Sequence, residues 1–328
     1  MDKCGGILQH HGLMFRCRFA LTVPLLLTLL THDARAVLVA GTTGNTSAPG
    51  DDPGWANVGS CNSASAIYLG NLWVLTAYHV NASGAFPVVF GSTAYTVSGP
   101  VNRLTNNGVA GMSAQTDLIV FQINADPGLP SLTVSASAPA VGDDIVMIGN
   151  GLNRQASRTF WQATMVADPG SDVWVETTPG LHNVEGFKAG AGATRRWGTN
   201  DAEAVNVDVF DGFGDVRSFL SLFDDDLAGR PNEAQGMVGD SGGPAFHKNG
   251  AQWELSGVML AVGTGGNPDY FDNPPANSAV FGQHLTVMAD LSFYRDQIVA
   301  LTIPEPSSAV LLAGAAAVSL RRRRCGRT

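Results

Sequence analysis

The chain has 328 residues, 45% of them hydrophobic and 14% charged, a composition that excludes a disordered or collagen-like protein. The net charge is −9, and basic residues are concentrated at both ends, so the body between residues 37 and 302 is more acidic still. This charge argues against nucleic-acid binding, and the length is enough to bury a large core.

The first 36 residues have the layout of a secretory signal peptide. Arg16 and Arg18 precede an apolar run over residues 19–30, and Ala34-Arg35-Ala36 provides small residues at alternate positions. The run is shorter than the roughly 20 apolar residues that cross a bilayer. We predict a signal peptide over residues 1–36, with cleavage after Ala36 and export through the inner membrane. A buried N-terminal helix is the alternative.

The body is predicted to be built mainly from short strands. Residues 37–56 are rich in Gly, Thr, Ser, Asp and Pro and predict an irregular leader. Apolar and β-branched runs separated by turn residues then predict strands, and Gly70-Asn71 between two runs indicates a hairpin. The predicted strands are residues 66–69, 72–75, 86–90, 94–97, 118–123, 132–134, 144–148, 160–165, 173–176, 204–209 and 253–260. A helix is predicted over residues 291–301, capped by Asp290.

Two of these strand regions carry a polar residue next to a long apolar run. Trp73-Val-Leu-Thr-Ala-Tyr-His79 ends in a histidine, and Thr116-Asp117-Leu-Ile-Val begins with an aspartate. Burying an aspartate costs free energy unless a partner is present. Taken alone, His79 has the ordinary interpretation of a packed or surface histidine, and Asp117 that of a cap or turn residue.

Acidic residues also gather further along the chain. Asp208, Asp211 and Asp215 precede a run of three aspartates at residues 224–226. Carboxylates bind calcium, but this spacing matches no known oxygen-ligand loop such as the EF-hand. We therefore predict a solvated acidic loop, with structural calcium as the alternative.

The sequence Gly239-Asp240-Ser241-Gly242-Gly243-Pro244 carries the strongest chemical signal. Four of its six residues are Gly or Pro, which force unusual backbone dihedrals around one serine. A serine attacks a carbonyl only with a base at hydrogen-bond distance, and that base needs an orienting group, while nearby amides can stabilise an oxyanion. His79 and Asp117 are the candidates for these roles, and the chemistry requires no metal or other cofactor.

These three segments, in the order His, Asp, Ser, resemble the motifs of the trypsin/chymotrypsin superfamily over roughly residues 59–301. The resemblance implies an all-β, chymotrypsin-like fold of two six-stranded antiparallel β-barrels within residues 37–302. The first barrel is expected at about residues 57–140 and the second at about 141–290, before the C-terminal helix. It further implies a serine endopeptidase that cleaves polypeptide substrates through an acyl-enzyme.

The resemblance also implies a role for each site residue. Ser241 is the expected nucleophile, His79 the general base and then acid, and Asp117 the carboxylate that fixes the tautomer of His79. The amides of Gly239 and Ser241 are expected to form the oxyanion hole. The alternatives are an inactive surface or matrix-binding protein with the protease fold, and an acyl hydrolase that does not cleave peptides.

Several positions depart from the pattern of that superfamily. Gln235, six residues before Ser241, stands where trypsins carry an acid, which argues against a preference for Arg or Lys substrates. Val80 stands where many relatives have a cysteine, and Cys61 has no partner in the body, so packing is expected to position His79. After signal cleavage, the amino group of Val37 is expected to pair with Asp240, unless Asp240 is satisfied locally.

The last 26 residues resemble a PEP-CTERM sorting tail of exported bacterial proteins. Pro304-Glu305-Pro306 is followed by an apolar segment over residues 307–320 and by four arginines at residues 321–324. In that family a sorting enzyme of the exosortase type processes the tail. The resemblance implies transient membrane association through residues 303–328 and a final location at the cell surface or in the extracellular matrix. An ordinary C-terminal membrane anchor is the alternative.

Overall fold

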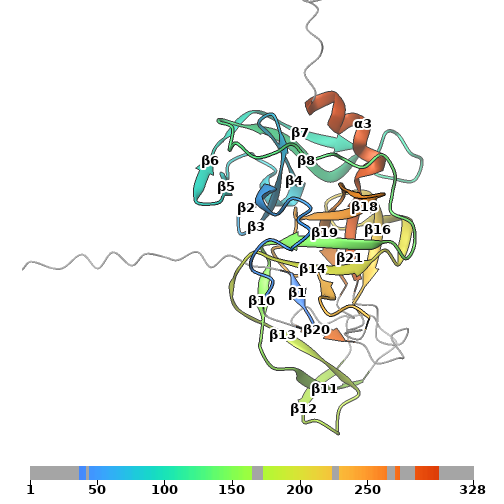
Figure 1. Cartoon of the computed structure of the whole chain (residues 1–328). Coiled ribbons are helices and arrows are strands. Elements are labelled where there is room, and N and C mark those ends of the chain that lie inside the picture. The colour runs from blue at the N-terminus through green and yellow to red at the C-terminus, as the bar shows by residue number, and fades with distance from the viewer. Residues whose placement is uncertain are drawn as a thin grey trace, which may run out of the picture. The chain divides into compact units, whose positions relative to one another are not determined.

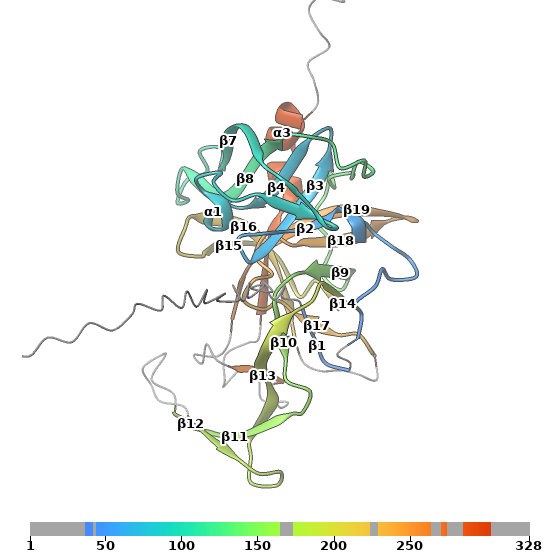
Figure 2. The ribbon, with the colours of Figure 1, turned by 90° about the vertical axis from the view of Figure 1, so that its left-hand side faces the viewer.

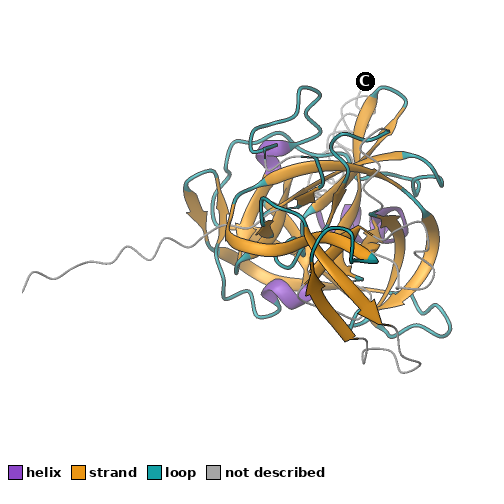
Figure 3. Cartoon of the chain, turned by 90° about the horizontal axis from the view of Figure 1, so that it is seen from below, coloured by secondary structure: helices purple, strands orange, loops and turns teal. Residues whose placement is uncertain are grey.

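Strands dominate the folded part of the chain, and helices are few (Figure 3). The computed structural model describes residues 37–41, 44–164, 173–223, 229–263, 270–273 and 285–302. The predicted signal and tail lie outside these residues, as does the aspartate run at 224–226. No helix in the described ranges is long and apolar enough to span a membrane.

The first large sheet is antiparallel and has seven strands in the order β6-β5-β2-β3-β4-β8-β7 (Figure 1). Its strands are β2 (Val58–Cys61), β3 (Ala64–Gly70), β4 (Trp73–Ala77), β5 (Val88–Phe90), β6 (Thr93–Tyr95), β7 (Val97–Thr105) and β8 (Gln115–Ile123). β3 is buried along its whole length. β4 and β8 are buried along most of their length, so their near-continuous apolar runs are covered on both faces of the sheet.

The β3–β4 hairpin forms as predicted, but its turn lies one residue later than expected. The two central residues are Asn71 (φ 50°) and Leu72 (φ 71°), which is the pattern of a type I′ turn. Gly70 (φ 113°) ends β3 and absorbs an irregularity in the pairing. A Cβ at this position would lie 2.1 Å from the Ser131 hydroxyl, so glycine is required there by contact as well as by conformation.

The second large sheet also has seven antiparallel strands, in the order β14-β9-β18-β19-β21-β16-β15. They are β9 (Asp144–Gly149), β14 (Arg196–Asp201), β15 (Ala204–Phe210), β16 (Asp215–Leu222), β18 (Pro244–Asn249), β19 (Gln252–Val262) and β21 (Leu285–Asp290). Each large sheet therefore has one strand more than the six per barrel that the resemblance implied. Within the described residues both strand orders are open, and closure into barrels stays a prediction.

A third sheet arises between β9 and β14, where the sequence predicted only two isolated strands. It contains β10 (Leu152–Arg154), β11 (Thr159–Thr164), β12 (Val173–Thr177), β13 (Val184–Ala193) and β20 (Tyr270–Asn273). β13 is its centre, since it pairs with β10, β11 and β20. Figure 2 shows the β11–β12 hairpin at the end of this sheet remote from α3. β13 was missed because it is rich in glycine and alanine.

The leader is more ordered than predicted. β1 (Leu38–Val39) pairs antiparallel with β17 (Ala234–Gln235), and the side chains of residues 37–40 are buried. A one-turn 3-10 helix, η1 (Trp55–Asn57), follows. Full burial of a valine or leucine side chain contributes roughly 1.5–3 kcal/mol, which explains why this short apolar stretch docks although polar residues surround it.

The C-terminal helix confirms its prediction closely. α3 (Leu291–Thr302) begins directly after β21, and its buried residues Leu291, Tyr294 and Ile298 recur at helical spacing. The Oδ1 of Asp290 accepts hydrogen bonds from the Ser292 backbone N–H (2.9 Å) and from the Ser292 hydroxyl (2.6 Å). The predicted cap therefore satisfies amide and hydroxyl donors in the first turn.

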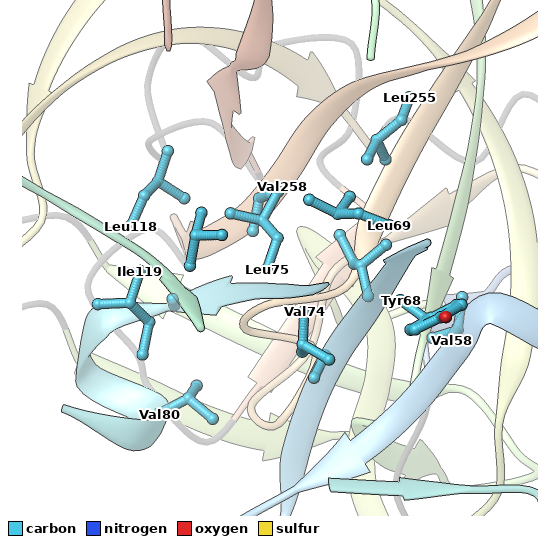
Figure 4. Close-up of a cluster of buried hydrophobic side chains, with 14 of the residues drawn as sticks. Val58, Tyr68, Leu69, Val74, Leu75, Val80, Leu118, Ile119, Leu255 and Val258 are labelled. Carbon is cyan, nitrogen blue, oxygen red and sulfur yellow. The ribbon is translucent and has the colours of Figure 1, made fainter. Parts of the chain in front are cut away.

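One hydrophobic core joins the two large sheets. Leu75 of β4 and Leu118 of β8 belong to the same buried cluster as Leu255 and Val258 of β19. Figure 4 shows these side chains together with Val74 and others from the first sheet. Because a close-packed core transmits small shifts, the positions of β4 and β8 are fixed relative to β19.

Candidate active site

The buried carboxylate of Asp117 binds His79 with both of its oxygens. The backbone N–H of His79 donates to Oδ1 (2.9 Å), and Nδ1 of the imidazole lies 2.6 Å from Oδ2. Asp117 is 0% exposed and the imidazole is 20% exposed. A proton on Nδ1 satisfies the carboxylate and leaves Nε2 as the hydrogen-bond acceptor of the ring. The structure thus brings these two predicted site residues together.

His79 lies in the first turn of a short helix rather than at the end of the strand itself. α1 (Tyr78–Asn81) follows β4 directly. The Asn62 side chain donates to the carbonyl of Val80 (2.9 Å), and the Arg103 guanidinium lies 3.5 Å over the ring of Tyr78. These contacts hold the helix in place of the disulfide that the sequence lacks.

Cys61 is a buried free thiol in the described part of the chain. Burial raises the pKa of this thiol to about 12, although the Asn81 side chain acts in the opposite direction. Because the thiolate is the reactive form, Cys61 packs as a small apolar residue under α1.

A tight turn precedes Ser241. The Asp240 N–H donates to the carbonyl of Met237 (2.9 Å), and Gly239 has φ 93°, which together define a type II β-turn. The Asp240 carboxylate accepts the backbone N–H of Met237 (2.7 Å) and of Gly151 (2.7 Å), so the loop is fixed from two sides. Within the described residues, the amides of Gly239 and Ser241 donate to no acceptor. They are therefore available to an anionic ligand.

The Ser241 loop is attached to the first sheet by buried hydrogen bonds. The N–H of Ser65 on β3 donates to the carbonyl of Ser241 (2.9 Å), and the Ser65 hydroxyl lies 3.4 Å from the carbonyl of Gly239. Thr76 on β4 donates to the carbonyl of Ser65 (2.6 Å). The Ser241 hydroxyl itself donates to the carbonyl of Leu260 (3.4 Å). Ser241 therefore lies beside the strand that leads into α1 and His79.

A cavity of about 160 Å³ opens next to Ser241. It is lined by residues 236–241 and 259–262, among which Met237, Val238, Leu260 and Val262 present apolar side chains. Gln235, the predicted specificity residue, is not among the lining residues. Its side chain is fully buried on β17, and its Nε2 lies 3.4 Å from the carbonyl of Gly263.

Asp240 and Val37 lie in separate environments. Burial raises the pKa of the Asp240 carboxyl well above its usual range, while the Met237 amide and the Arg196 charge act in the opposite direction. Val37 packs in an apolar cluster with Val39 and Ala234. Residues before Val37 are outside the described part, so pairing of a free Val37 amino group with Asp240 stays a prediction.

The sequence missed two residues that contact the His79–Asp117 pair. The ring of Phe213 stacks on the imidazole of His79, with centroids 4.7 Å apart and planes at 22°. Asp211 faces Asp117, and burial together with the charge of Asp117 raises its pKa to about 6. Both lie in the loop between β15 and β16, and Figure 2 shows this hairpin beside α1.

The aspartate run at 224–226 lies outside the described residues, so the predicted solvated acidic loop stays a prediction there; of the upstream acids, Asp208 is exposed, whereas Asp211 and Asp215 are partly buried. Asp208 pairs with Arg217 (2.6 Å), Asp215 accepts the N–H of Ser113 (2.5 Å), and Asp211 points inward. Asp208 finds its partner within the hairpin, whereas Asp215 and Asp211 meet Ser113 and Asp117, which lie about 100 residues earlier in the sequence. In the ranges that the structure describes, no three His, Cys, Asp or Glu side chains are grouped to hold a metal ion.

The sequence model of the trypsin-like peptidase domain family matches residues 64–258, a span that includes His79, Asp117 and Ser241. No curated protein sequence shows a significant match. An inactive form of the Rv3671c protease aligns at 14% identity over 76% of this chain and 90% of its own, with a TM-score of 0.41. A Ser-to-Ala mutant of Rv3671c from M. tuberculosis H37Rv aligns at 13% identity over 74% of this chain and 83% of its own, also at 0.41. A variant of the HtrA-type protease AlgW, solved with a decapeptide, aligns at 16% identity over 72% of this chain and 50% of its own, at 0.40.

The loop after Ser241 provides a stability test. Gly242 has φ +82°, and a Cβ there would lie 2.1 Å from both the Ser65 carbonyl and the Thr76 hydroxyl, whereas Gly250 has φ +64° and open space around it. We expect Gly250→Ala to cost about 1–2 kcal/mol from backbone strain alone. Gly242→Ala is expected to cost about 1–3 kcal/mol more, because Ser65 and Thr76 must also move to make room for the added methyl group. Urea unfolding of both variants measures the difference, and equal midpoints would contradict this account.

Proposed function

The chain belongs to the trypsin-like peptidase family and is a serine peptidase, and we propose that it cleaves polypeptides through a triad of Ser241, His79 and Asp117. The observation that supports this triad is the buried Asp117 carboxylate, which accepts both the backbone N–H and the imidazole Nδ1 of His79. That arrangement fixes the tautomer in which Nε2 can take a proton.

In the proposed reaction the Ser241 Oγ bonds to the substrate carbonyl carbon while its proton passes to Nε2 of His79. The carbonyl oxygen becomes an oxyanion that accepts the amides of Gly239 and Ser241. The C–N bond then breaks, and the proton on Nε2 moves to the leaving amine. A water molecule, deprotonated by the same nitrogen, attacks the acyl-enzyme and releases the acid and the free serine. Asp117 stays ionised throughout and stabilises the imidazolium.

We further propose that the side chain before the cleaved bond occupies the cavity beside Ser241 and is small and apolar. The volume of about 160 Å³ and the apolar side chains of its lining support this preference. The carboxylate of Asp240 is turned away toward backbone amides, so a guanidinium or ammonium group in the cavity has no free acid to pair with.

Replacing the nucleophile tests the triad. We expect Ser241→Ala to lower kcat by about 10⁴-fold or more and to abolish labelling by a fluorophosphonate probe. Ser83→Ala, at an exposed serine near α1, is the control and is expected to react like the wild type. Labelling that persists in Ser241→Ala contradicts the triad. A labelled wild type that digests esters but no peptide library supports the acyl hydrolase, and an unlabelled one supports the inactive binding protein.

Enlarging the cavity tests the substrate preference. Val262 lines the cavity, and Val262→Gly removes three carbon atoms from its wall. We expect the ratio of kcat/KM for phenylalanyl over alanyl peptides to rise about tenfold or more, because each methylene in such a pocket changes discrimination by roughly 1–3 kcal/mol. A peptide-library digest measures the ratio. Rapid wild-type cleavage after Arg or Lys would contradict the apolar preference.

We propose that the enzyme is exported and then sorted by its ends. The signal-like residues 1–36 support export through the inner membrane, and residues 303–328 support processing by an exosortase-type enzyme, with release to the cell surface or extracellular matrix. Cleavage after Ala36 also frees the amino group of Val37. We propose that this group pairs with Asp240, whose oxygens keep further lone pairs available.

Mass spectrometry of both termini tests the export proposal. In the native host, the extracellular enzyme is expected to begin at Val37 and to lack the four arginines of residues 321–324. A chain truncated after residue 302 is expected to be exported but lost from the normal sorting route. Recovery of the uncleaved full chain from the cytoplasm would contradict the proposal.

A further inference from the structure

The loop between β15 and β16 belongs to the second sheet but is fixed against the first. A Cβ on Gly214 would lie 2.5 Å from the carbonyl of Gln115, so the loop backbone touches the start of β8. Arg103 on β7 bridges the two sides, because its Nε donates to the carbonyl of Thr116 (2.8 Å) and its Nη2 to the carbonyl of Phe213 (2.5 Å). The loop is therefore held next to Asp117.

The two oxygens of Asp211 are in different environments. Oδ1 accepts the backbone N–H groups of Phe213 (2.9 Å) and Gly214 (3.2 Å), which sets the orientation of the carboxyl group. Oδ2 is buried and has no donor among the described residues. Its neighbour is the carboxyl group of Asp117, within hydrogen-bond reach. A single proton between the two groups converts a repulsive contact into a hydrogen bond.

The surroundings decide which carboxyl group carries that proton. Asp117 already accepts two donors from His79, so its oxygens act as hydrogen-bond acceptors. The other charged or titratable groups on the packed elements already have partners. Arg103 on β7 is bound to backbone carbonyls and lies over the Tyr78 ring of α1, and Asp215 on β16 is bound to a backbone amide. Asp208 on β15 and Arg217 on β16 pair with each other. Asp211 therefore has no cation of its own, and burial followed by the Asp117 charge raises its pKa to about 6.

We propose that Asp211 is a positioning residue of the active site, which donates a hydrogen bond from Oδ2 to Asp117 and so fixes the carboxylate that orients His79. The proposal rests on the triad proposed above. The same loop stacks Phe213 on the imidazole, so one hairpin of the second sheet restrains both members of the pair. The protease thus gains by hydrogen bonding and stacking the restraint that no disulfide near Cys61 provides.

The proposal has a defined pH dependence. Since the pKa of Asp211 is raised in the folded chain above the ordinary value of about 3.9, its proton stabilises the fold fully below about pH 4. This contribution is lost as the pH rises through about 6. Above that pH Asp211 no longer donates to Asp117 and adds a second negative charge beside it. The acidic limb of the activity profile then contains two ionisations.

Asp211→Asn is the informative variant, because its Oδ1 still accepts the loop amides and its Nδ2 still donates to Asp117, but it carries no charge. We expect the acidic limb of kcat/KM to become a single ionisation with its midpoint about one pH unit lower. Asp211→Ala, which lacks the donor, is expected to lower kcat about tenfold with KM unchanged when measured below about pH 6, where Asp211 carries its proton, and the asparagine variant restores it. Asp208→Asn, on the same hairpin but paired with Arg217, is the control and should match the wild type. An Asp211→Asn profile that superimposes on the wild type overturns the proposal.

Proton NMR of the His79 imidazole separates this inference from the function itself. In the Ser241→Ala background, adding Asp211→Asn is expected to lower the pH midpoint of the Nδ1 proton signal, while Asp208→Asn leaves it in place. An unchanged midpoint overturns the role of Asp211 even if Ser241 is the labelled nucleophile. A lowered midpoint supports that role. If the midpoint is lowered but peptidase activity survives Ser241→Ala, the triad is contradicted and the role of Asp211 is not. Thermal unfolding of each variant verifies that it is folded.

Discussion

The arrangement of the site depends on one constraint, the complete burial of the Asp117 carboxylate. A buried charge is tolerated only when donors surround it. His79 supplies two of these donors from α1, and Asp211 faces the carboxylate from the β15–β16 loop. The need to satisfy one carboxylate therefore draws together a helix of the first sheet and a loop of the second. The imidazole of His79 itself stays 20% exposed.

A second set of polar contacts attaches the Ser241 loop to the first sheet. Ser65 is the central residue of these contacts. Its hydroxyl accepts the Asn150 amide, its carbonyl accepts the Thr76 hydroxyl, and its N–H donates to the Ser241 carbonyl. All of these bonds are buried, so breaking any one leaves an unsatisfied group in the interior. Glycine at position 242 permits the close approach. The two sheets are therefore joined by these hydrogen bonds as well as by the apolar core that they share.

The chain achieves this without disulfides in the described residues. Instead, the guanidinium of Arg103 links three parts of the site: the ring of Tyr78, the carbonyl of Thr116 and the carbonyl of Phe213. Arginine suits this role because its planar group stacks on an aromatic ring while its edge donates in several directions. Among the aspartates of the hairpin, Asp208 pairs with Arg217 and Asp215 accepts the Ser113 amide, whereas Asp211 faces Asp117.

The sequence alone determined the parts of this protein that depend on local chemistry. The glycine-rich turn at Ser241, the cap of Asp290 and the hairpin at Asn71 follow from backbone preferences of a few adjacent residues. The apolar runs around Asp117 likewise predicted a strand. These features identified the family and the candidate triad, because its motifs are short and continuous.

Only the tertiary structure decided what lies next to those motifs. Gln235 follows the expected spacing, yet its side chain is buried on β17 away from the cavity that Val262 lines. Asp211 resembled a solvated acid, and the glycine-rich β13 gave no strand signal. In each case the outcome depends on a partner distant in the chain, and burial or pairing by such a partner leaves no local pattern.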